Sequence, residues 1–307
     1  MALSLNASTR LLVVAPHPDD ESIATGELIQ QVRQSGGEVR IVLLTNGDNN
    51  PWPQRWVERR LRIGGDERRR WGERRRGEVG QALQQLGVEP SALQALSWPD
   101  MGLTDRLHEA LAPSLAVLTD VLNISRPNLV ALPALGDHHP DHSAAHVLMR
   151  LALAAWQVSQ PQLLAYLVHG HEGEVAGKIK LDSSVGLHIN KLAALACHRS
   201  QMALSGKRMR RMADRAERYL LVKPGIGESK VLPWMPPVAL QPWLHLMVVD
   251  DRGVRSWPWA KAPVSRDEQG RYTLQARADG AAGPCFVKLY MNVPSPWIFD
   301  RWGWCEL

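Results

Sequence analysis

Cysteine is scarce in this sequence, with three residues among 307: Cys197, Cys285 and Cys305. They lie far apart and form no C-x-x-C pair, which argues against a disulfide framework and against a cysteine-based metal site. Long apolar runs are also missing, because the run after the N-terminus is only LLVVA, whereas a membrane-spanning helix needs about 20 apolar residues. We therefore expect a cytoplasmic protein, and we leave open a peripheral position at the inner face of a membrane.

Charge of one sign does not dominate the sequence either. The 36 lysines and arginines exceed the 31 acidic residues by five, and the pI is about 9.3. So mild an excess suits an anionic substrate or an anionic membrane surface as well as it suits nucleic acid. Internal repeats and low-complexity tracts are absent from the sequence.

Short apolar runs alternate with helical segments along most of the chain. The runs at 10–16, 38–45 and 127–133 read as fully buried strands, because each is short and continuously apolar. Helices between such strands are typical of a parallel sheet. We predict an α/β fold with a Rossmann-like, mostly parallel sheet flanked by helices over residues 1–223, and a small β-rich region over residues 224–307.

Residues 48–76 are an insert rich in arginine and tryptophan. Ten arginines lie between residues 55 and 76, beside Trp52, Trp56 and Trp71, and four carboxylates offset part of the charge. Three interpretations stay open: a solvated, ion-paired helical insert, a contact with an anionic glycan or lipid, and a contact with nucleic acid. Nucleic acid has the least support, because the sequence has no helix-turn-helix, zinc-finger or RRM signature.

Two clusters of histidine and aspartate follow buried strands. The segment APHPDDES contains His17 and Asp20, and the segment HHPDH contains His139 and His142. In open α/β sheets the loops at the carboxyl ends of the strands form the ligand site. Histidine and carboxylate together suit Zn²⁺, with Fe²⁺ or another divalent ion as the alternative. We predict a metal site made of His17, Asp20 and one histidine of the second cluster, with a second aspartate left to accept a proton.

The two clusters resemble the motifs of the PIG-L/LmbE-like zinc-dependent N-deacetylases. That family has an H-P-D-D-E motif similar to APHPDDES and an H-P-D-H motif similar to HPDHSAAH. Further similar segments are TNGD (45–48), RRGEVGQALQQLGV (75–88), WPDMGL (98–103) and the predicted helix KLAALACHRSQ (191–201). The resemblance covers roughly residues 10–220 of the chain.

The resemblance implies a role for each residue that matches a motif. His17 and Asp20 would bind zinc together with His142. Asp19 would be the general base that activates water. His139 would stabilise the oxyanion or donate a proton to the leaving amine.

Five further polar residues receive predicted roles. Arg75, Asp100 and Asp48 would contact the substrate, and Asp141 and His146 would orient His142. Structural alternatives stay open for four of them: a solvated helix face for Arg75, a turn for Asp48, and loop bracing for Asp141 and His146.

The function that the resemblance implies is metal-dependent removal of an N-acetyl group from an amino sugar of the N-acetylglucosamine type, in a glycolipid or glycoconjugate. The basic insert favours a phosphorylated or lipid-linked substrate, such as a bacterial envelope glycan. A non-catalytic zinc- or sugar-binding module is one alternative, although the acid set Asp19, Asp20 and His139 argues against it. A different metallohydrolase is the other, although the sequence has no second carboxylate cluster for a two-metal site.

Overall fold

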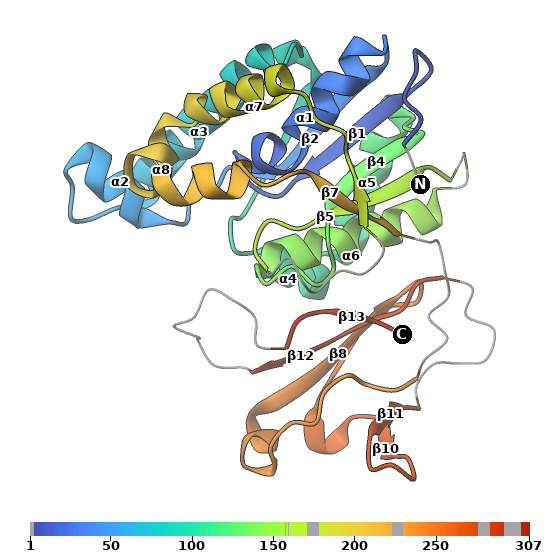
Figure 1. Cartoon of the computed structure of the whole chain (residues 1–307). Helices are drawn as coiled ribbons and strands as arrows, with labels where there is room; N and C mark the ends of the chain where they lie inside the picture. Colours follow the sequence, from blue (N-terminus) through green and yellow to red (C-terminus); the bar gives the residue numbers. More distant parts are fainter. Residues whose placement is uncertain are drawn as a thin grey trace.

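A seven-stranded sheet lies at the centre of the computed structural model, which describes residues 3–156, 158, 160–170, 178–222, 230–275, 283–291 and 302–307. Its strands are β1 (Arg10–Ala15), β2 (Glu38–Thr45), β3 (Leu93–Trp98), β4 (Leu129–Pro133), β5 (Gln162–Tyr166), β6 (Lys178–Lys180) and β7 (Arg218–Val222). They lie in the order β3-β2-β1-β4-β5-β7-β6 (Figure 1). β1 to β5 run parallel, whereas β7 pairs antiparallel with β5 and with β6. The predicted mostly parallel sheet is confirmed.

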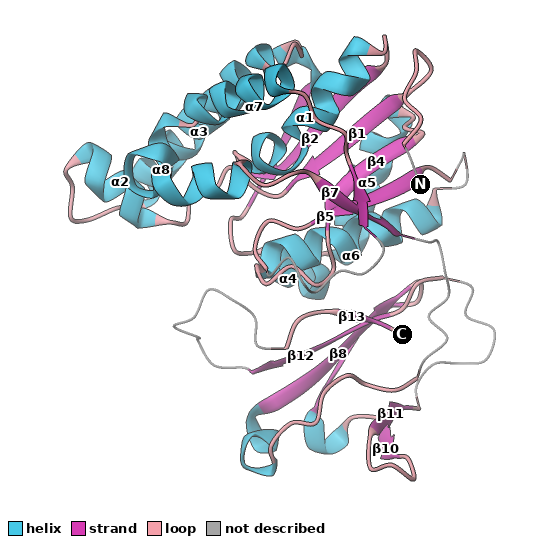
Figure 2. Ribbon diagram, viewed as in Figure 1, coloured by secondary structure: helices cyan, strands magenta, loops and turns pink. Residues whose placement is uncertain are grey.

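Helices cover both faces of this sheet (Figure 2). Leu11 and Val13 of β1 pack in a core cluster completed by α1, α3, α7 and α8, and Leu12 and Val14 pack in a second cluster with α4, α5 and α6. Because both faces of β1 are buried, its sequence is apolar throughout instead of alternating. The helices are α1 (Asp20–Gln34), α2 (Pro51–Glu58), α3 (Gly65–Gln85), α4 (Leu103–Glu109), α5 (Leu111–Ser125), α6 (Pro140–Ala155), α7 (Val185–Cys197) and α8 (Arg199–Ala213), with short 3₁₀ helices η1 (Pro90–Ala92), η3 (Val238–Trp243) and η4 (Trp259–Lys261).

The predicted helix over residues 191–201 is broken, and this part of the prediction is wrong. α7 ends at Cys197 and α8 begins at Arg199, because His198 leaves helical geometry with φ −77° and ψ 55°. The break lets His198 Nε2 approach Glu21 Oε1 to 2.9 Å, and both side chains are buried. A buried ion pair of this kind outweighs the local preference for a continuous helix.

The arginine-rich insert folds as two helices. α2 begins after Asn50, whose side chain accepts a hydrogen bond from the Trp52 N–H, and Pro51 occupies the first helical position. α2 packs beside α8 at one end of the molecule (Figure 1). Trp71 of α3 is buried, whereas Trp52 and Trp56 of α2 are exposed. The insert is therefore partly core and partly surface.

A second sheet follows in the C-terminal part of the chain, as predicted. It is antiparallel with the order β13-β12-β8-β9, and a separate hairpin pairs β10 with β11. Phe286 and Val249 of this sheet pack into the cluster that contains α6, and Arg150 Nη2 lies 2.6 Å from Glu306 Oε1. The predicted boundary at residues 223–224 lies outside the described residues. The strands are β8 (Leu244–Asp250), β9 (Gly253–Pro258), β10 (Val264–Arg266), β11 (Tyr272–Leu274), β12 (Phe286–Met291) and β13 (Cys305–Glu306).

Candidate metal centre and its cavity

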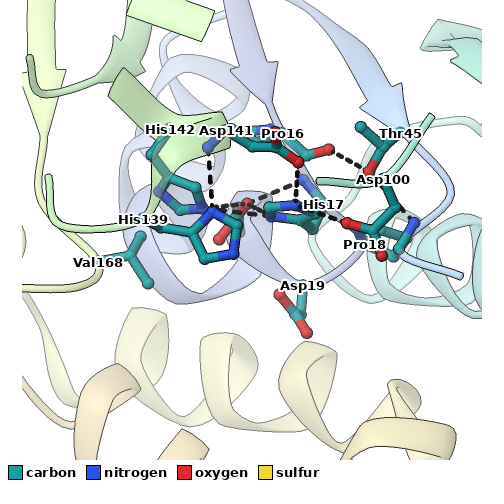
Figure 3. A network of polar contacts seen from close by, with 12 residues as sticks. Pro16, His17, Pro18, Asp19, Thr45, Asp100, His139, Asp141, His142 and Val168 are labelled. Atoms are coloured by element: carbon teal, nitrogen blue, oxygen red, sulfur yellow. Dashed lines mark hydrogen bonds and ion pairs between the residues drawn. The ribbon is translucent and has the colours of Figure 1, made fainter. Parts of the chain in front are cut away.

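Two loops meet at the carboxyl edge of the central sheet, where β1 and β4 lie side by side. The chain passes from β1 through α1 to β2 on one side, whereas β4 pairs on the other side, so the strand order reverses here. Open α/β sheets bind ligands at such a point. The loop after β1 supplies His17 and Asp19, and the loop after β4 with the start of α6 supplies His139 and His142 (Figure 3).

Three donor atoms at this edge form a nearly equilateral triangle. His17 Nδ1 lies 3.3 Å from His142 Nε2 and 3.4 Å from Asp20 Oδ2, and His142 Nε2 lies 3.2 Å from Asp20 Oδ2. Around a tetrahedral zinc ion with bonds of about 2.05 Å, neighbouring ligand atoms are about 3.3 Å apart. A wider group of ring nitrogens, from His17, His139 and His142, lies within 4.8 Å of one another. These side chains, of which His17 and His142 are buried, can hold a divalent metal ion.

Each histidine of the triangle is held from behind by carboxylates. His17 Nε2 lies 3.2 Å from Asp100 Oδ1 and 3.2 Å from Asp141 Oδ2. His142 Nδ1 lies 3.2 Å from Asp137 Oδ2. A carboxylate on one ring nitrogen fixes the tautomer and the ring orientation, and makes the other nitrogen a better ligand. His17 Nδ1 and His142 Nε2 are thus oriented to act as ligands of a cation.

The same charges shift one another's pKa. Burial lowers the pKa of His142, but the carboxylates of Asp20 and Asp137 outweigh it and raise that pKa to about 10. Burial raises the pKa of Asp20, but His142 and His17 overcome it and hold that pKa well below its usual value. Without a metal the site is therefore a network of ion pairs, and a cation that binds must displace protons from the histidines.

Asp19 lines the cavity next to this triangle, in a backbone conformation that non-glycine residues rarely adopt. Its φ is 115°. Its N–H donates to Glu21 Oε2 over 3.0 Å, and its Oδ2 accepts from Arg75 Nη2 over 3.2 Å. Burial raises the pKa of Asp19 to about 6, against the opposing charge of Arg75. A carboxylate with a pKa near neutrality suits proton abstraction.

His139 caps α6 and also lines the cavity. Its Nδ1 accepts a hydrogen bond from the Asp141 N–H over 3.3 Å, so a neutral ring carries its proton on Nε2. Burial lowers the pKa of His139, and the positive charges of His17 and His142 lower it further. A neutral Nε2–H is a hydrogen-bond donor, which is what a developing oxyanion requires.

The cluster opens into a cavity of about 320 Å³, which lies within the range of roughly 300–1,000 Å³ that is common for ligand pockets. His17 and Asp20 of the triangle form part of its lining. The remaining walls come from the start of α2, the loop before α4, the loop after β5, and α8, and include Trp52, Met101, Val168, Gln201, Arg208 and Met209. Both apolar and polar side chains thus surround the cavity.

Arg75, predicted to contact the substrate, braces the loop after β1 in this structure. Its guanidinium donates to the carbonyl oxygens of Gly47 and Pro18 as well as to Asp19. Gly47 has a φ of 61°, and a side chain there would overlap the guanidinium, which explains the glycine of TNGD. The alternative of a solvated helix face is wrong, because Arg75 is only 5% exposed. Arg75 also lines the cavity, and its contact with substrate stays a prediction.

Two other predicted substrate contacts differ in their positions. Asp100 lines the cavity, and it accepts a hydrogen bond from the Asn49 N–H over 2.7 Å while it holds His17. Asp48 is half-buried and is not among the described residues that line the cavity. The structure thus gives Asp100 a bracing role, and substrate contact by either residue stays a prediction.

Asp141 and His146 contact other partners than His142, the residue that they were predicted to orient. Asp141 approaches His17 and accepts hydrogen bonds from the N–H groups of Met101 and Leu103, over 2.7 and 3.0 Å. His146 Nδ1 lies 2.8 Å from the Pro133 carbonyl oxygen. Loop bracing describes the contacts with the Met101 and Leu103 N–H groups and with the Pro133 carbonyl oxygen, because a loop needs its backbone N–H and C=O groups satisfied. Asp141 in addition holds His17.

Sequence reasoning assigned no role at the candidate metal site to Asp137 or to His169. Asp137 takes the place behind His142 that was predicted for Asp141, and it also accepts from the N–H groups of Val168 and His169. His169 follows β5, the strand next to β4, and lines the cavity. A polar residue just past a buried strand is a detectable signal, and applying that rule to β5 would have found His169.

Comparisons with known proteins identify relatives of this chain. Residues 12–153 match the family model described as "PIG-L: GlcNAc-PI de-N-acetylase". A 1D-myo-inositol 2-acetamido-2-deoxy-alpha-D-glucopyranoside deacetylase of Mycobacteroides abscessus is 34% identical over 170 residues, which are 49% of this chain and 58% of that protein. The chain thus matches less than two thirds of the length of this relative.

Solved structures share the fold. The N,N'-diacetylchitobiose deacetylase of Pyrococcus horikoshii has a TM-score of 0.54 and 20% identity, covering 69% of this chain and 83% of its own. A 4-carboxy-2-hydroxymuconate hydratase of Pseudomonas putida has a TM-score of 0.51 and 21% identity, covering 72% of this chain and 98% of its own. Because one fold carries both activities, the fold by itself does not decide the reaction.

Proposed function

We propose that this chain, which carries a PIG-L family domain at residues 12–153, is a metal-dependent N-deacetylase of amino sugars. The observation that carries the proposal is the triangle of His17, Asp20 and His142, whose donor atoms are 3.2–3.4 Å apart. Asp19 and His139 line the same cavity. The site thus combines a place for a cation with a base and a hydrogen-bond donor, which hydrolysis of an amide requires.

Zinc is the ion that we propose for the triangle. Two imidazole nitrogens and one carboxylate oxygen, with no thiolate, match the three protein ligands of many catalytic zinc sites. Fe²⁺ is the alternative, because nitrogen and oxygen ligands also accept it. When bound, zinc supplies a water molecule of lowered pKa and polarises the amide carbonyl group. The carboxylates behind His17 and His142 would keep the two rings oriented toward the ion.

Two residues of the chain would handle protons and charge. Asp19 would accept a proton from the attacking water through Oδ1, which has no partner among the described residues, while Arg75 holds Oδ2. His139 would donate a hydrogen bond from Nε2 to the carbonyl oxygen as that oxygen becomes negatively charged. Loss of one such donor costs about 3–4 kcal/mol of transition-state stabilisation. The amine would leave after it takes up the proton that Asp19 accepted.

The substrate that we propose is an N-acetylated amino sugar in a phosphorylated or lipid-linked glycoconjugate. The relatives described above support the sugar part, since the names of two of them specify acetamido sugars. Arg208 and Trp52 at the cavity wall support the second part, because a cation and an aromatic ring suit an anionic group and a sugar ring.

Two alternatives make different predictions at the same site. A non-catalytic binding module would hold metal and sugar but release no acetate. A hydratase, as in the Pseudomonas putida structure, would add water to a carbon–carbon double bond. It would show no preference for acetamido sugars over other compounds. Asp19 lines the cavity and has a pKa raised to about 6, which suits a general base for amide hydrolysis and favours this reaction.

Acetate release is the direct test. A panel of N-acetylated glycosides would be incubated with the wild type, Asp19→Asn and His139→Gln, and the metal content of each protein would be measured. We expect wild-type release that stops on chelation and returns with Zn²⁺. We expect Asp19→Asn to lose at least a hundredfold in kcat with metal retained. Full activity of Asp19→Asn, or wild-type metal without any acetate release, would refute a deacetylase of this mechanism.

A further inference from the structure

Positive charge gathers at one end of the molecule, around the mouth of the cavity. Residues 49–76 and 199–213, which contain α2, most of the exposed part of α3, and α8, carry fifteen lysines and arginines and four carboxylates. Since the whole chain has 36 such cations and 31 carboxylates, the rest of it has six more carboxylates than cations. The excess charge of the chain therefore resides entirely at this end.

The carboxylates of this end neutralise only a few of its arginines. Glu58 pairs with Arg70, Glu67 with Arg60, and Asp66 with Arg69. Several exposed cations form no ion pair with any described residue; among them are Arg59, Arg62, Lys207, Arg208 and Arg211. These groups remain available to an external anion.

Large apolar side chains are exposed among these cations. Trp52 is 65%, Trp56 67% and Leu61 88% exposed, and Leu204 of α8 is also exposed. Solvent-exposed tryptophan and leucine among arginines are typical of surfaces that insert into the headgroup region of a bilayer. A solvated, ion-paired helical insert does not account for the joint exposure of these tryptophan and leucine side chains.

The exposed groups lie on helix stripes that start at the cavity. Trp52 lines the cavity, and Trp56 follows it four residues later on the same side of α2. Arg208 lines the cavity from α8, with Leu204 and Arg211 on the same side of that helix. α2 and α8 pack against each other (Figure 1). Trp52 and Arg208 thus lie at the cavity, and further apolar and cationic groups extend from them along α2 and α8.

We propose that this surface, formed by α2, the loop 59–64 and α8, docks the protein on an anionic lipid bilayer. Tryptophan and leucine would enter the interface while the unpaired arginines contact acidic headgroups. The docking rests on charge and exposure alone. Its consequence, that a lipid-linked sugar could enter the site without leaving the bilayer, rests on the proposed deacetylase function.

Vesicle flotation of the full chain tests the proposal. We expect binding to vesicles of one third phosphatidylglycerol in phosphatidylcholine at about 0.1 M salt, weak binding to pure phosphatidylcholine, and loss of binding at about 1 M salt. Arg59→Gln/Arg62→Gln should weaken binding roughly 10- to 30-fold, because each cation near such a surface contributes about a factor of five. Trp56→Ala/Leu61→Ala should weaken it by a similar factor.

A matched control uses exposed apolar residues elsewhere. Val185→Ala/Ile189→Ala on α7 removes comparable exposed side chains and should leave vesicle binding unchanged. The proposal would be overturned if the wild type bound both vesicle types equally. It would also be overturned if Arg59→Gln/Arg62→Gln and Trp56→Ala/Leu61→Ala bound the anionic vesicles as tightly as the wild type. Displacement of the vesicles by a single-stranded oligonucleotide at lower concentration would identify nucleic acid as the partner and overturn it too.

Turnover of a water-soluble N-acetylglucosaminide separates this proposal from the proposed function. Trp56→Ala/Leu61→Ala should retain wild-type turnover, because neither residue lines the cavity among the described residues. If neither the wild type nor the variants release acetate while vesicle binding follows the expected pattern, the proposed deacetylase function is refuted and the proposed docking surface is supported.

Discussion

Replacement of Asp137 by asparagine tests how the proposed metal centre is built. Asp137 Oδ2 lies 3.2 Å from His142 Nδ1 and accepts from the N–H groups of Val168 and His169, over 2.9 and 3.0 Å. Its Oδ1 accepts from the His139 N–H over 2.9 Å. In Asp137→Asn only one of these positions can remain an oxygen, so the amide NH₂ must face an N–H donor on one side.

The magnitude follows from what the carboxylate does for His142. Loss of a carboxylate behind a ligating histidine typically lowers metal affinity or activity about 10- to 100-fold. One unsatisfied buried N–H adds a stability cost of about 1–3 kcal/mol. We therefore expect a zinc Kd raised 10- to 100-fold, measured by competition with a chelator, and a free energy of unfolding of the metal-free protein lowered by a few kcal/mol.

A control separates metal affinity from general destabilisation. Glu217→Gln disturbs another buried network, in which Glu217 accepts from the N–H groups of Glu27 and Leu28. It should lower stability and leave the zinc Kd unchanged. An unchanged Kd in Asp137→Asn, or the same rise in both variants, would refute the assignment of Asp137 as the residue that orients His142.

Three further predictions concern stability and catalysis. Burial lowers the pKa of His146 to about 3, so below pH 6.5 the imidazole takes up a proton in the unfolded chain but stays neutral in the folded one. Between pH 7 and pH 5 the wild type should therefore lose about 2 kcal/mol more free energy of unfolding than His146→Gln, as measured by urea unfolding. Equal losses would contradict this prediction. In the wild type Lys191 Nζ lies 3.0 Å from Glu217 Oε1, and Lys191→Met leaves Glu217 buried without this cation. The substitution should lower the free energy of unfolding by about 3–5 kcal/mol, and adding Glu217→Gln should restore part of it. The midpoints of chemical unfolding of the three proteins test this prediction. Arg75→Met releases Asp19 and should lower kcat more than tenfold with metal content unchanged; a change confined to KM would instead assign Arg75 to substrate binding.

Local sequence determined the framework of the fold. RLLVVA is apolar at every position because both faces of β1 are covered, and such a run predicts a buried parallel strand without knowledge of its neighbours. The position of His17 just past that strand was enough to place it at the carboxyl edge of the sheet. The family motifs then supplied the expected partners, Asp20 and His142, which the structure brings within 3.4 Å of His17.

Tertiary structure decided which groups stand behind these residues. Asp141 is adjacent to His142 in sequence, yet the first turn of α6 points its carboxylate at His17, and Asp137 reaches His142 instead. The break at His198 likewise depends on Glu21, which is 177 residues away. Motif spacing determines which residues share a loop, but the direction of a side chain depends on the backbone dihedral angles and on partners from distant segments, and only the folded chain specifies these.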